Sequence, residues 1–489
     1  MPTHASETIP GLTPAVRAEP YCHPPNHASP HPPHAGEAGA PALDTRHSSL
    51  SPVTMSGSRR LRMAVIGGGM FFDDIIGLAC KDMMRGGIAP SLTSVGMSHL
   101  ARDVADIEIE LVSVGTHRAE SGTAGKIADS FAEDFPDRPV KPRYGATVWR
   151  DILREDRPDV LLVATPDHVH TEPIIEALEA GCDVVTEKPL CLHTAEVDRI
   201  LAAAKAADRI VAVDMHKRYD PFVRDMMLNA HKKYGRINRV RAVLEEPLEV
   251  STEIFAWAEQ SDPFAYVGCH WLDVVHHYFK VAPVSLFATG QRHLLAHWDE
   301  HAVELARRWG RDLSTFRKTG PIDTWDSLDV SVTYDNAMRG DYSTNWINPP
   351  EFEGAVNQEI EVYGIYGRGF VDQQDRGFRE AVTGDGSRTR NPTFGGRIVH
   401  EGGNLEIFGY GKASIVSGML AIARRRFLGA SIDALDGTFP TAASQRDVVR
   451  VIEAAGVVAA KNHEALAAGR GTPFTARFEG DEFEVVPCN

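Results

Sequence analysis

The sequence has few cysteines, no long apolar run and no excess of basic residues, and each of these features argues against a class of protein. The six cysteines lie far apart without CxxC spacing, which argues against a disulfide or zinc framework and favours reduced thiols in a cytoplasmic protein. No apolar run approaches the roughly 18 residues that a membrane span requires. A formal net charge of −16 argues against nucleic acid or an anionic membrane as the main partner.

The first 57 residues differ in composition from the rest of the 489-residue chain. The stretch YCHPPNHASPHPPHAGEAGAP is rich in Pro, His, Ala and Ser and almost lacks large aliphatic side chains. Such a segment cannot bury enough apolar surface to offset its chain entropy. We therefore expect residues 1–57 to be a disordered tail rather than a His-rich metal site, and Met55 to be a possible translation start.

Residues 58–216 alternate between two kinds of segment. Five short runs rich in Val and Ile are separated by helix-like stretches, of which TEPIIEALEAG and TAEVDRILAAAKAA are the clearest. Thr194 is a candidate N-cap of the second stretch, and Gly181 is placed to end the first in a left-handed conformation. Strands that alternate with helices predict a doubly wound parallel sheet, so this part is expected to be an α/β Rossmann domain.

Residues 217–489 follow a different pattern. LDVSVTYDNAMRGDYSTNWI alternates around Asp335-Asn336, and EIEVYGIYGRGFVDQQ alternates around Gly367-Arg368-Gly369, which predicts two hairpins. The charged residues 291–322 look like an insertion that contains a helix, and residues 445–466 look like a long closing helix. We expect a C-terminal α+β domain with a mostly antiparallel sheet, which serves substrate binding and oligomerisation.

A glycine-rich turn follows the first Val- and Ile-rich run. In AVIGGGMFF, Gly67, Gly68 and Gly69 stand between a strand and a helix, where glycine lets a pyrophosphate approach the backbone at a helix N-terminus. The match to G-x-G-x-x-G is incomplete, because Phe72 replaces the third glycine. We predict a dinucleotide site with Gly67, Gly69 and Met70 in its phosphate loop.

The second run ends in Thr116, His117 and Arg118, without an acidic residue. An acid at this point would bind the ribose of NAD, whereas a basic residue suits the 2′-phosphate of NADP. We expect these three residues to bind the cofactor and to favour NADP over NAD. The alternative is that Arg118 is an ordinary surface arginine. The long spacing from Gly69 marks RGGIAPSLTSVGMSHLARDVAD as an insertion after the first helix.

The segment GCHWLDVVHHYF, residues 268–279, is predicted to be a helix. His270, Asp273 and His277 fall on one of its faces, because they are spaced i, i+3 and i+7. An Asp one turn before a His holds the imidazole in one tautomer and stabilises its protonated form. The same residues could form a polar face in solvent or ligate a metal. Nicotinamide chemistry needs no metal, and we expect none.

Taken together, these segments resemble the Gfo/Idh/MocA family, which includes glucose–fructose oxidoreductase and inositol dehydrogenase. The resemblance covers residues 61 to about 475 and rests on AVIGGGM, ATPDHVHTEPIIEALEAGCDVVTEKP, VDMHKRYDP and GCHWLDVVHHY. Phe72 and the two insertions depart from the family pattern. The resemblance implies that VVTEKPLCL runs from a buried strand straight into Glu187 and Lys188 because both charges serve a site at the carboxyl edge of the sheet.

The resemblance also assigns roles to particular residues. Lys188, Asp273 and His277 are the implied catalytic residues: His277 is the base, Asp273 orients it, and Lys188 donates a hydrogen bond to the substrate oxygen. The implied cofactor site is completed by Thr165, Pro166, His170 and Glu187. The implied substrate site consists of Lys188, Arg218, Tyr219, His270 and His277.

The predicted function is hydride transfer between a sugar or polyol CH–OH group and NADP or NAD, by a homo-oligomer that is a dimer or a tetramer. One alternative is a redox-neutral, NAD-dependent glycosidase of the same superfamily, which oxidises the sugar transiently, eliminates the aglycone and returns the hydride. A second alternative is a non-catalytic protein that senses a sugar or nucleotide. The intact set Lys188, Asp273 and His277 argues against that alternative.

Overall fold

A computed structural model of the chain describes residues 59–488, except 350, 353–355, 375–377, 383–385, 392 and 400–404. The predicted tail, residues 1–57, lies outside the described residues. In the part of the chain that is described, none of the helices combines the length and the apolar character that crossing a membrane requires.

The first sheet has six parallel strands in the order β3-β2-β1-β4-β5-β6. Its strands are β1 (Arg59–Ile66), β2 (Ile107–Thr116), β3 (Lys141–Tyr144), β4 (Val160–Val163), β5 (Asp183–Thr186) and β6 (Val211–Val213). All five Val- and Ile-rich runs form strands, which confirms the predicted Rossmann-type sheet. The edge strand β3, KPRY, was missed because it contains no apolar run. The strand order reverses between β1 and β4, and such a switch point opens a crevice at the carboxyl ends of the strands.

The helices of this half confirm most of the sequence predictions. They are α1 (Gly77–Gly86), α2 (Thr123–Asp134), α3 (Val148–Asp151), α4 (Thr171–Glu179) and α5 (Thr194–Ala207). Gly181 has φ +81° after α4, as predicted. The N-cap of α5 is His193, which forms a capping box with Glu196. The prediction of Thr194 as the cap was therefore wrong, and its hydroxyl donates to Glu453 instead (2.7 Å).

The second sheet has eight strands in the order β12-β11-β7-β10-β9-β8-β17-β18, and only β7 and β10 pair in parallel. Its strands are β7 (Ile237–Pro247), β8 (Pro283–Gln291), β9 (Ser327–Tyr334), β10 (Arg339–Asn348), β11 (Asn357–Gly364), β12 (Arg368–Asp372), β17 (Phe474–Glu479) and β18 (Glu482–Pro487). Both predicted hairpins are present, as β9–β10 and β11–β12. The turn of the second lies at residues 365–367, so Arg368 and Gly369 already belong to β12.

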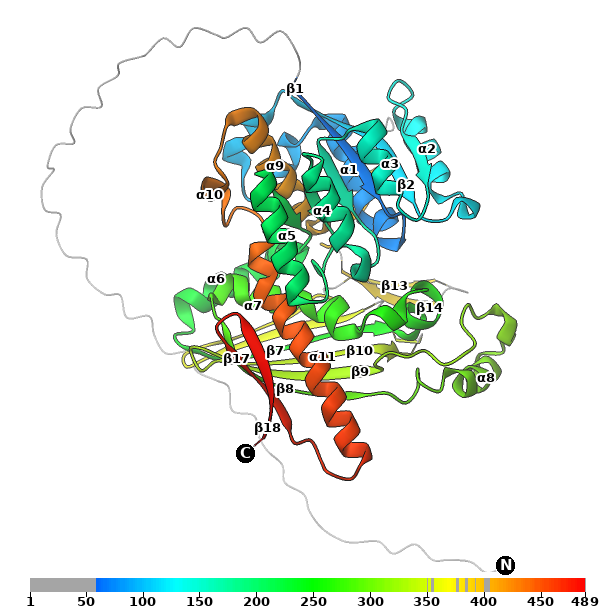
Figure 1. Cartoon of the computed structure of the whole chain (residues 1–489), viewed down its shortest axis with the longest axis vertical. Coiled ribbons are helices and arrows are strands. Elements are labelled where there is room, and N and C mark those ends of the chain that lie inside the picture. Colours follow the sequence, from blue (N-terminus) through cyan, green and yellow to red (C-terminus); the bar gives the residue numbers. More distant parts are fainter. Residues whose placement is uncertain are drawn as a thin grey trace, which may run out of the picture. The chain divides into compact units, whose positions relative to one another are not determined.

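Helices cover this sheet, and two small hairpins follow it. The helices are α6 (Pro221–Lys233), α7 (Cys269–Phe279), α8 (Trp298–Trp309) and α11 (Arg446–Ala467), and the hairpins are β13 (Phe378–Val382) with β14 (Gly386–Arg390) and β15 (Gly396–Val399) with β16 (Leu405–Phe408). The short helix α10 (Ile432–Leu435) belongs with the first sheet, in whose core Leu435 packs. The long helix α11 packs on β8, β17 and α7, and Figure 1 shows it running beside α7 and across the sheet. The predicted helices at 268–279, in the insertion and at 445–466 are confirmed as α7, α8 and α11.

The helix α9 (Ala413–Leu428) returns to the first sheet. It contacts β5 and β6, and its buried side chains share a hydrophobic core with those of β1. Just beyond α9, the chain hydrogen-bonds to the edge of β6, from Val213 N to Pro440 O (2.9 Å) and from Ala442 N to Val211 O (3.1 Å). The expected boundary at residues 216 and 217 therefore separates the two sheets but not the elements that cover them.

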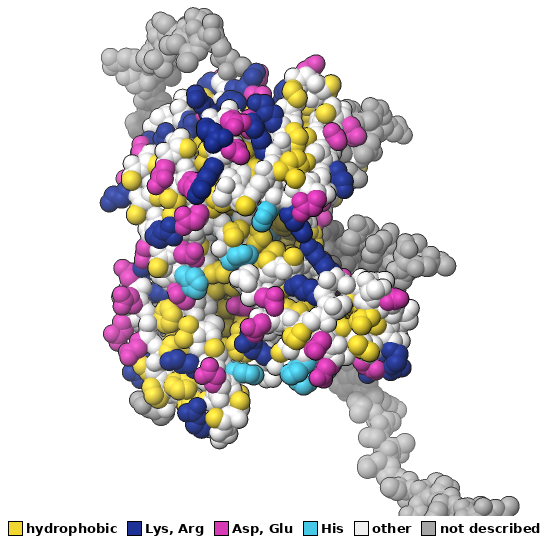
Figure 2. Space-filling model, turned by 45° about the vertical axis from the view of Figure 1, so that its right-hand side comes forward, with side chains coloured by type: hydrophobic (Ala, Val, Ile, Leu, Met, Phe, Trp, Pro, Cys, Tyr) yellow, Lys and Arg dark blue, Asp and Glu magenta, His cyan; other side chains and the backbone are white. Residues whose placement is uncertain are grey.

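The surface carries charges of both signs. Figure 2 shows acidic and basic side chains interspersed over one face, with hydrophobic and histidine side chains between them.

Candidate functional site

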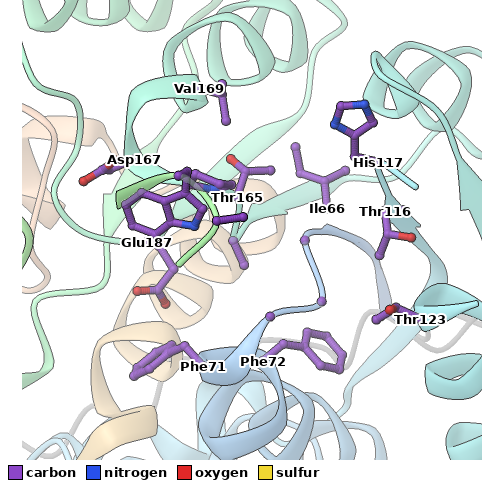
Figure 3. Close-up of a pocket in the computed structure, with 18 of the residues that line it drawn as sticks. Ile66, Phe71, Phe72, Thr116, His117, Thr123, Thr165, Asp167, Val169 and Glu187 are labelled. Atoms are coloured by element: carbon purple, nitrogen blue, oxygen red, sulfur yellow. The ribbon is translucent and has the colours of Figure 1, made fainter. Parts of the chain in front are cut away.

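A cavity of about 750 Å³ lies at the carboxyl ends of the parallel strands. It is lined by the turns that follow β1, β2, β4 and β5, and by residues 254–257 and Tyr266 from the second half of the chain. Figure 3 shows Thr116 and His117 on one side of it and Glu187 and Asp167 on the other, with Ile66 and Thr165 between them. The cavity therefore runs from the nucleotide end of the sheet to Glu187 and Lys188.

The glycine turn after β1 brings bare backbone to this cavity. Gly67 has φ +100°, and a Cβ added to it would lie 2.0 Å from the carbonyl oxygen of Ala164. No atom would lie within 4 Å of a Cβ added to Gly69, so that residue borders open space. Phe72 is only 3% exposed and packs in the core beside Gly77, whose added Cβ would lie 3.0 Å from the phenyl ring. Gly77 thus leaves room for the Phe72 ring within the same helical stretch.

Most of the predicted cofactor residues line the cavity. These are Gly67, Gly69, Met70, Thr116, His117, Arg118, Thr165, Pro166 and Glu187. His170 is the exception: it is fully buried, and its ring lies between the carbonyl oxygens of Pro189 (2.9 Å from Nδ1) and Thr165 (2.8 Å from Nε2). Its role in the structure is to hold the turn after β4 against the turn after β5.

Glu187 and Lys188 are buried at the carboxyl end of β5, with exposed fractions of 8% and 6%. Burial raises the pKa of Glu187 well above its ordinary value; the Asp214 carboxylate raises it further, and Lys188 opposes the change. Burial therefore favours the neutral form of the Glu187 carboxyl group. Lys188 Nζ donates to the carbonyl oxygen of Tyr266 (2.9 Å) and lies 3.4 Å from the centre of the Tyr266 ring. Both halves of the chain thus hold the lysine in place.

Two histidines meet beside Lys188. The rings of His216 and His270 have centroids 4.6 Å apart, and neither Nδ1 atom has a hydrogen-bond partner among the residues that the structure describes. Burial lowers the pKa of His270 well below its ordinary value, and the neighbouring charges of His216, Lys188 and Lys217 lower it further. His216 Nδ1 lies 3.5 Å from a carboxylate oxygen of Asp214. His270 is therefore a neutral imidazole next to a lysine.

His216 and Asp214 were missed as site residues, although the sequence contained a signal for them. They directly follow β6, just as Glu187 and Lys188 directly follow β5, and β5 and β6 are neighbouring parallel strands. Parallel strands have their carboxyl ends at the same edge of a sheet. A charged or imidazole side chain immediately after either strand is therefore a candidate for the same site.

The hydrogen bonds of Asp273 in the structure go to residues other than His277. Asp273 accepts two hydrogen bonds from Arg218 (2.5 and 2.6 Å) and one from Gln445 (2.7 Å). Neither His270 nor His277 is among the residues that line the cavity. Burial lowers the pKa of His277 to about 4, and the charges that act on it most are those of Arg218 and Asp273, whereas the charge of Lys188 acts on the pKa of His270. The carboxylate is thus held mainly by the guanidinium of Arg218, and its negative charge also acts on His277, whose pKa it raises.

Arg218 and Tyr219 hold the two halves of the chain together and do not line the cavity. Arg218 is 6% exposed and belongs to the buried ion pair with Asp273, while Tyr219 donates its hydroxyl hydrogen to Ser417 of α9 (2.8 Å). Their placement near the contact between the halves agrees with the sequence prediction, but neither side chain reaches the cavity.

The buried ion pair leads to a prediction about stability. We expect Arg218→Met to lower the free energy of unfolding by about 3–5 kcal/mol, because it leaves the Asp273 carboxylate buried without a cation. The double variant Arg218→Met/Asp273→Leu should regain much of that loss, since it removes both charges. Urea unfolding of the three proteins measures the effect. A normal unfolding midpoint for Asp273→Asn together with a large fall in kcat would return Asp273 to the catalytic residues.

The cavity fits a dinucleotide on several counts. The open backbone at Gly69 and the helix that starts after it suit a pyrophosphate, while Thr116 and Arg118 suit the adenosine end. Across the described ranges of 59–488, no group of three or more His, Cys, Asp and Glu side chains is arranged to hold a metal ion.

Comparison with known proteins agrees with this geometry. Residues 61–215 match the profile of the oxidoreductase family with an NAD-binding Rossmann fold, and residues 227–368 match the Gfo/Idh/MocA C-terminal domain. A putative oxidoreductase of Bacillus subtilis, YteT, is 26% identical over 267 residues, which are 51% of this chain and 62% of that protein. D-glucoside 3-dehydrogenase of Escherichia coli is 36% identical over 81 residues, 16% of this chain and 23% of that protein. The chain thus spans less than two thirds of the length of these curated relatives.

Solved structures share the fold. GenD2 from gentamicin A biosynthesis, in complex with NAD, has a TM-score of 0.57 at 18% identity and covers 86% of this chain and 97% of its own. Levoglucosan dehydrogenase, in complex with NADH and L-sorbose, has a TM-score of 0.56 at 19% identity and covers 88% of this chain and 100% of its own.

Proposed function

This chain belongs to the Gfo/Idh/MocA family of oxidoreductases, and on that premise we propose that it transfers a hydride between a sugar or polyol CH–OH group and a nicotinamide cofactor. The observation that carries the proposal is Lys188, which lines the cavity, together with the neutral His270, whose pKa is lowered by the charge of that lysine. A nicotinamide cofactor, when bound, supplies the hydride acceptor or donor. Apart from the cofactor, the reaction needs a group that accepts the hydroxyl proton and a positive charge beside the substrate oxygen.

His270 and Lys188 are suited to these two tasks. A neutral imidazole can accept the hydroxyl proton, and the low pKa of His270 keeps it neutral at physiological pH. Lys188 can donate a hydrogen bond to the same oxygen as it becomes a carbonyl. In the reverse direction the two residues return the proton to the oxygen. His270 thus takes the role that the sequence suggested for His277.

The cofactor proposal rests on the residues that line the cavity. The glycine turn and Met70 would hold the pyrophosphate, and Thr165, Pro166 and Glu187 would border the nicotinamide end. A homo-oligomer, dimer or tetramer, remains part of the proposal, and light scattering of the purified protein tests it.

We further propose that NADP is preferred over NAD. Arg118 lines the nucleotide end of the cavity, where no acidic residue follows β2. Arg118→Ala should weaken NADP binding by about tenfold or more and leave NAD binding nearly unchanged, because a charge-assisted hydrogen bond contributes about 1.5–3 kcal/mol. Calorimetric titration with both cofactors measures the difference. Arg154→Ala, which removes the same charge from the exposed surface, is the control. A clear NAD preference in the unmodified protein would refute the proposal.

A second imidazole, that of His216, favours one further candidate function, the redox-neutral cleavage of glycosides. Oxidation of an alcohol needs one base, whereas elimination of an aglycone from the oxidised sugar also requires removal of a carbon-bound proton next to the new carbonyl. His216, held near Asp214, is a second acid–base group at a ring distance of 4.6 Å from His270. Water then adds to the C=C bond that elimination leaves, and the carbonyl is reduced again by the cofactor, so the cleavage leaves no net change in cofactor.

One experiment separates the two candidates. A panel of sugars, polyols and aryl glycosides is incubated with the protein and NADP or NAD, and both reduced nicotinamide and free aglycone are measured. Accumulation of reduced cofactor without aglycone supports the dehydrogenase. Release of aglycone without accumulated reduced cofactor supports the glycosidase. Absence of both products across the panel would refute both proposals.

A further inference from the structure

The long insertion in the second half supports one wall of the cavity. Strands β8 and β9 are antiparallel neighbours, and such strands can be joined by a few residues, yet residues 292–326 lie between them. This insertion carries α8 and forms a separate hydrophobic core, in which Trp298 and Phe316 pack with Phe255 and Trp346. Nothing in the proposed hydride transfer requires this core, so its position calls for another explanation.

The insertion fixes the backbone of residues 253–261. The Arg317 guanidinium donates to the carbonyl oxygens of Glu253 (3.1 Å) and Ile254 (2.9 Å), and the Thr324 hydroxyl donates to the carbonyl oxygen of Ser261 (2.8 Å). From the other side, the Ser261 hydroxyl donates to the Asp167 carboxylate in the turn after β4 (2.6 Å). The segment is thus held between the insertion and the Rossmann half.

This segment brings aromatic rings to the Lys188 end of the cavity. Phe255 and Trp257 line the cavity with their rings stacked at 4.4 Å, and Trp257 meets Tyr266 edge to face at 5.7 Å. Tyr266 in turn lies under Lys188 Nζ at 3.4 Å. Phe255 is buried, whereas Trp257 and Tyr266 are half-buried. Because Lys188 Nζ lies over the Tyr266 ring, the indole of Trp257 is the ring of this wall that offers a ligand an accessible surface.

We propose that the insertion positions Trp257 as the binding surface for a cyclic sugar, whose C–H face lies on the indole while a ring hydroxyl points to Lys188. This inference rests on the proposed function and narrows its substrate class to pyranoses and pyranosides. A pyranose chair has an apolar face of C–H groups and a polar rim of hydroxyls, which matches an aromatic wall beside one cation. An open-chain polyol has no such rigid face. Trp257 is then a specificity-determining residue, and Arg317 is a positioning residue behind it.

The test compares ring and open-chain ligands on matched variants. Methyl pyranosides of glucose, galactose and xylose, and the hexitols sorbitol and mannitol, are titrated calorimetrically into the protein with reduced cofactor present, so that binding is measured without turnover. KM and kcat are then measured with oxidised cofactor. The variants are Trp257→Ala, Trp257→Phe, Arg317→Ala and, as a control on an exposed aromatic residue outside the cavity, Phe222→Ala.

We expect the unmodified protein to bind at least one pyranoside more tightly than both hexitols. Trp257→Ala should weaken that binding and raise KM by about tenfold or more, with kcat changed by less than about threefold. Trp257→Phe should recover part of the loss, and Arg317→Ala should give an intermediate KM with a normal Kd for the cofactor. Thermal unfolding checks that each variant is folded. If Arg317→Ala does not fold, Trp257→Phe still tests the role of the indole.

Two results would overturn the inference: hexitols that bind as tightly as pyranosides, or pyranoside binding that is unchanged in Trp257→Ala. Pyranoside binding without any turnover would refute the proposed function but support Trp257 as a binding surface for pyranoses. Turnover of hexitols alone would support the proposed function but refute that binding surface.

Discussion

Lys188→Ala and His270→Ala should each lower kcat by about 10²-fold or more, the range expected for a positioned acid–base group. Both should leave the Kd of the cofactor nearly unchanged, because neither residue is placed at the glycine turn. His277→Ala is the matched control: it removes an imidazole from the same helix, α7, at a position where the charges that act most on the pKa are those of Arg218 and Asp273. Steady-state kinetics with calorimetric cofactor titration provide both quantities.

The pH dependence gives an independent check on the same assignment. Because the pKa of His270 lies well below the ordinary histidine value, its base form persists to lower pH than that of a free histidine. We therefore expect kcat/KM to stay level through neutral pH and to fall only at a pH below about 6.5, as the imidazole takes up a proton. His270→Ala should abolish this acid limb, and His277→Ala should retain it. Loss of the limb in His277→Ala instead would show that the base had been assigned to the wrong end of α7.

Gly67→Ala should unfold the protein more easily as well as weaken cofactor binding. A methyl group at Gly67 would lie 2.0 Å from the carbonyl oxygen of Ala164, and φ +100° is a conformation that side chains rarely tolerate. The turn must therefore move, and backbone strain together with overpacking should lower the free energy of unfolding by about 3 kcal/mol or more. Thermal unfolding without cofactor measures this loss, and titration with NADP measures the change in affinity.

Gly69→Ala separates cofactor binding from stability at the same turn. Its added methyl group meets no atom within 4 Å, so the free energy of unfolding should change by no more than about 0.5 kcal/mol. The methyl group would, however, enter the space that the pyrophosphate needs, and the cofactor Kd should rise by about tenfold or more. Normal cofactor affinity in a stably folded Gly69→Ala would mean that the phosphates do not lie at this turn.

The sequence was most informative where function follows directly from a strand end. A buried strand that runs into Glu187 and Lys188 is a local pattern, and the structure places both residues at the edge of the sheet where the pattern indicated. The choice between His270 and His277 lies beyond the sequence for a different reason. Periodicity identifies the face of a helix but not the position along its axis, and seven residues span about 10 Å. The proposal of His270 therefore depends on the structure, in which the charge of Lys188 acts on the pKa of His270.

The remaining gaps come from contacts between distant parts of the chain. Arg218 is 55 residues from Asp273, and no spacing rule connects them, so Asp273 was paired with its neighbour on the helix. The aromatic wall was missed because residues 250–260 form short irregular turns, which have no hydrophobic period to detect. The insertion was visible as a departure from the family, but its contact with Phe255 depends on tertiary packing.

The return of α9 to β5 and β6 has a consequence for chimeric proteins. Nucleotide-binding halves of this kind are attractive modules for exchange between dehydrogenases, and the obvious cut lies after β6. In this chain such a cut would remove the helix that covers one face of two strands, the buried Arg426–Asp183 contact (2.6 Å) and the segment that pairs with the edge of β6. The graft would expose apolar surface and an open strand edge, both of which promote aggregation. A workable chimera must therefore carry residues 410–442 together with residues 59–216. The cofactor half is compact in the fold but is built from two separate stretches of the sequence.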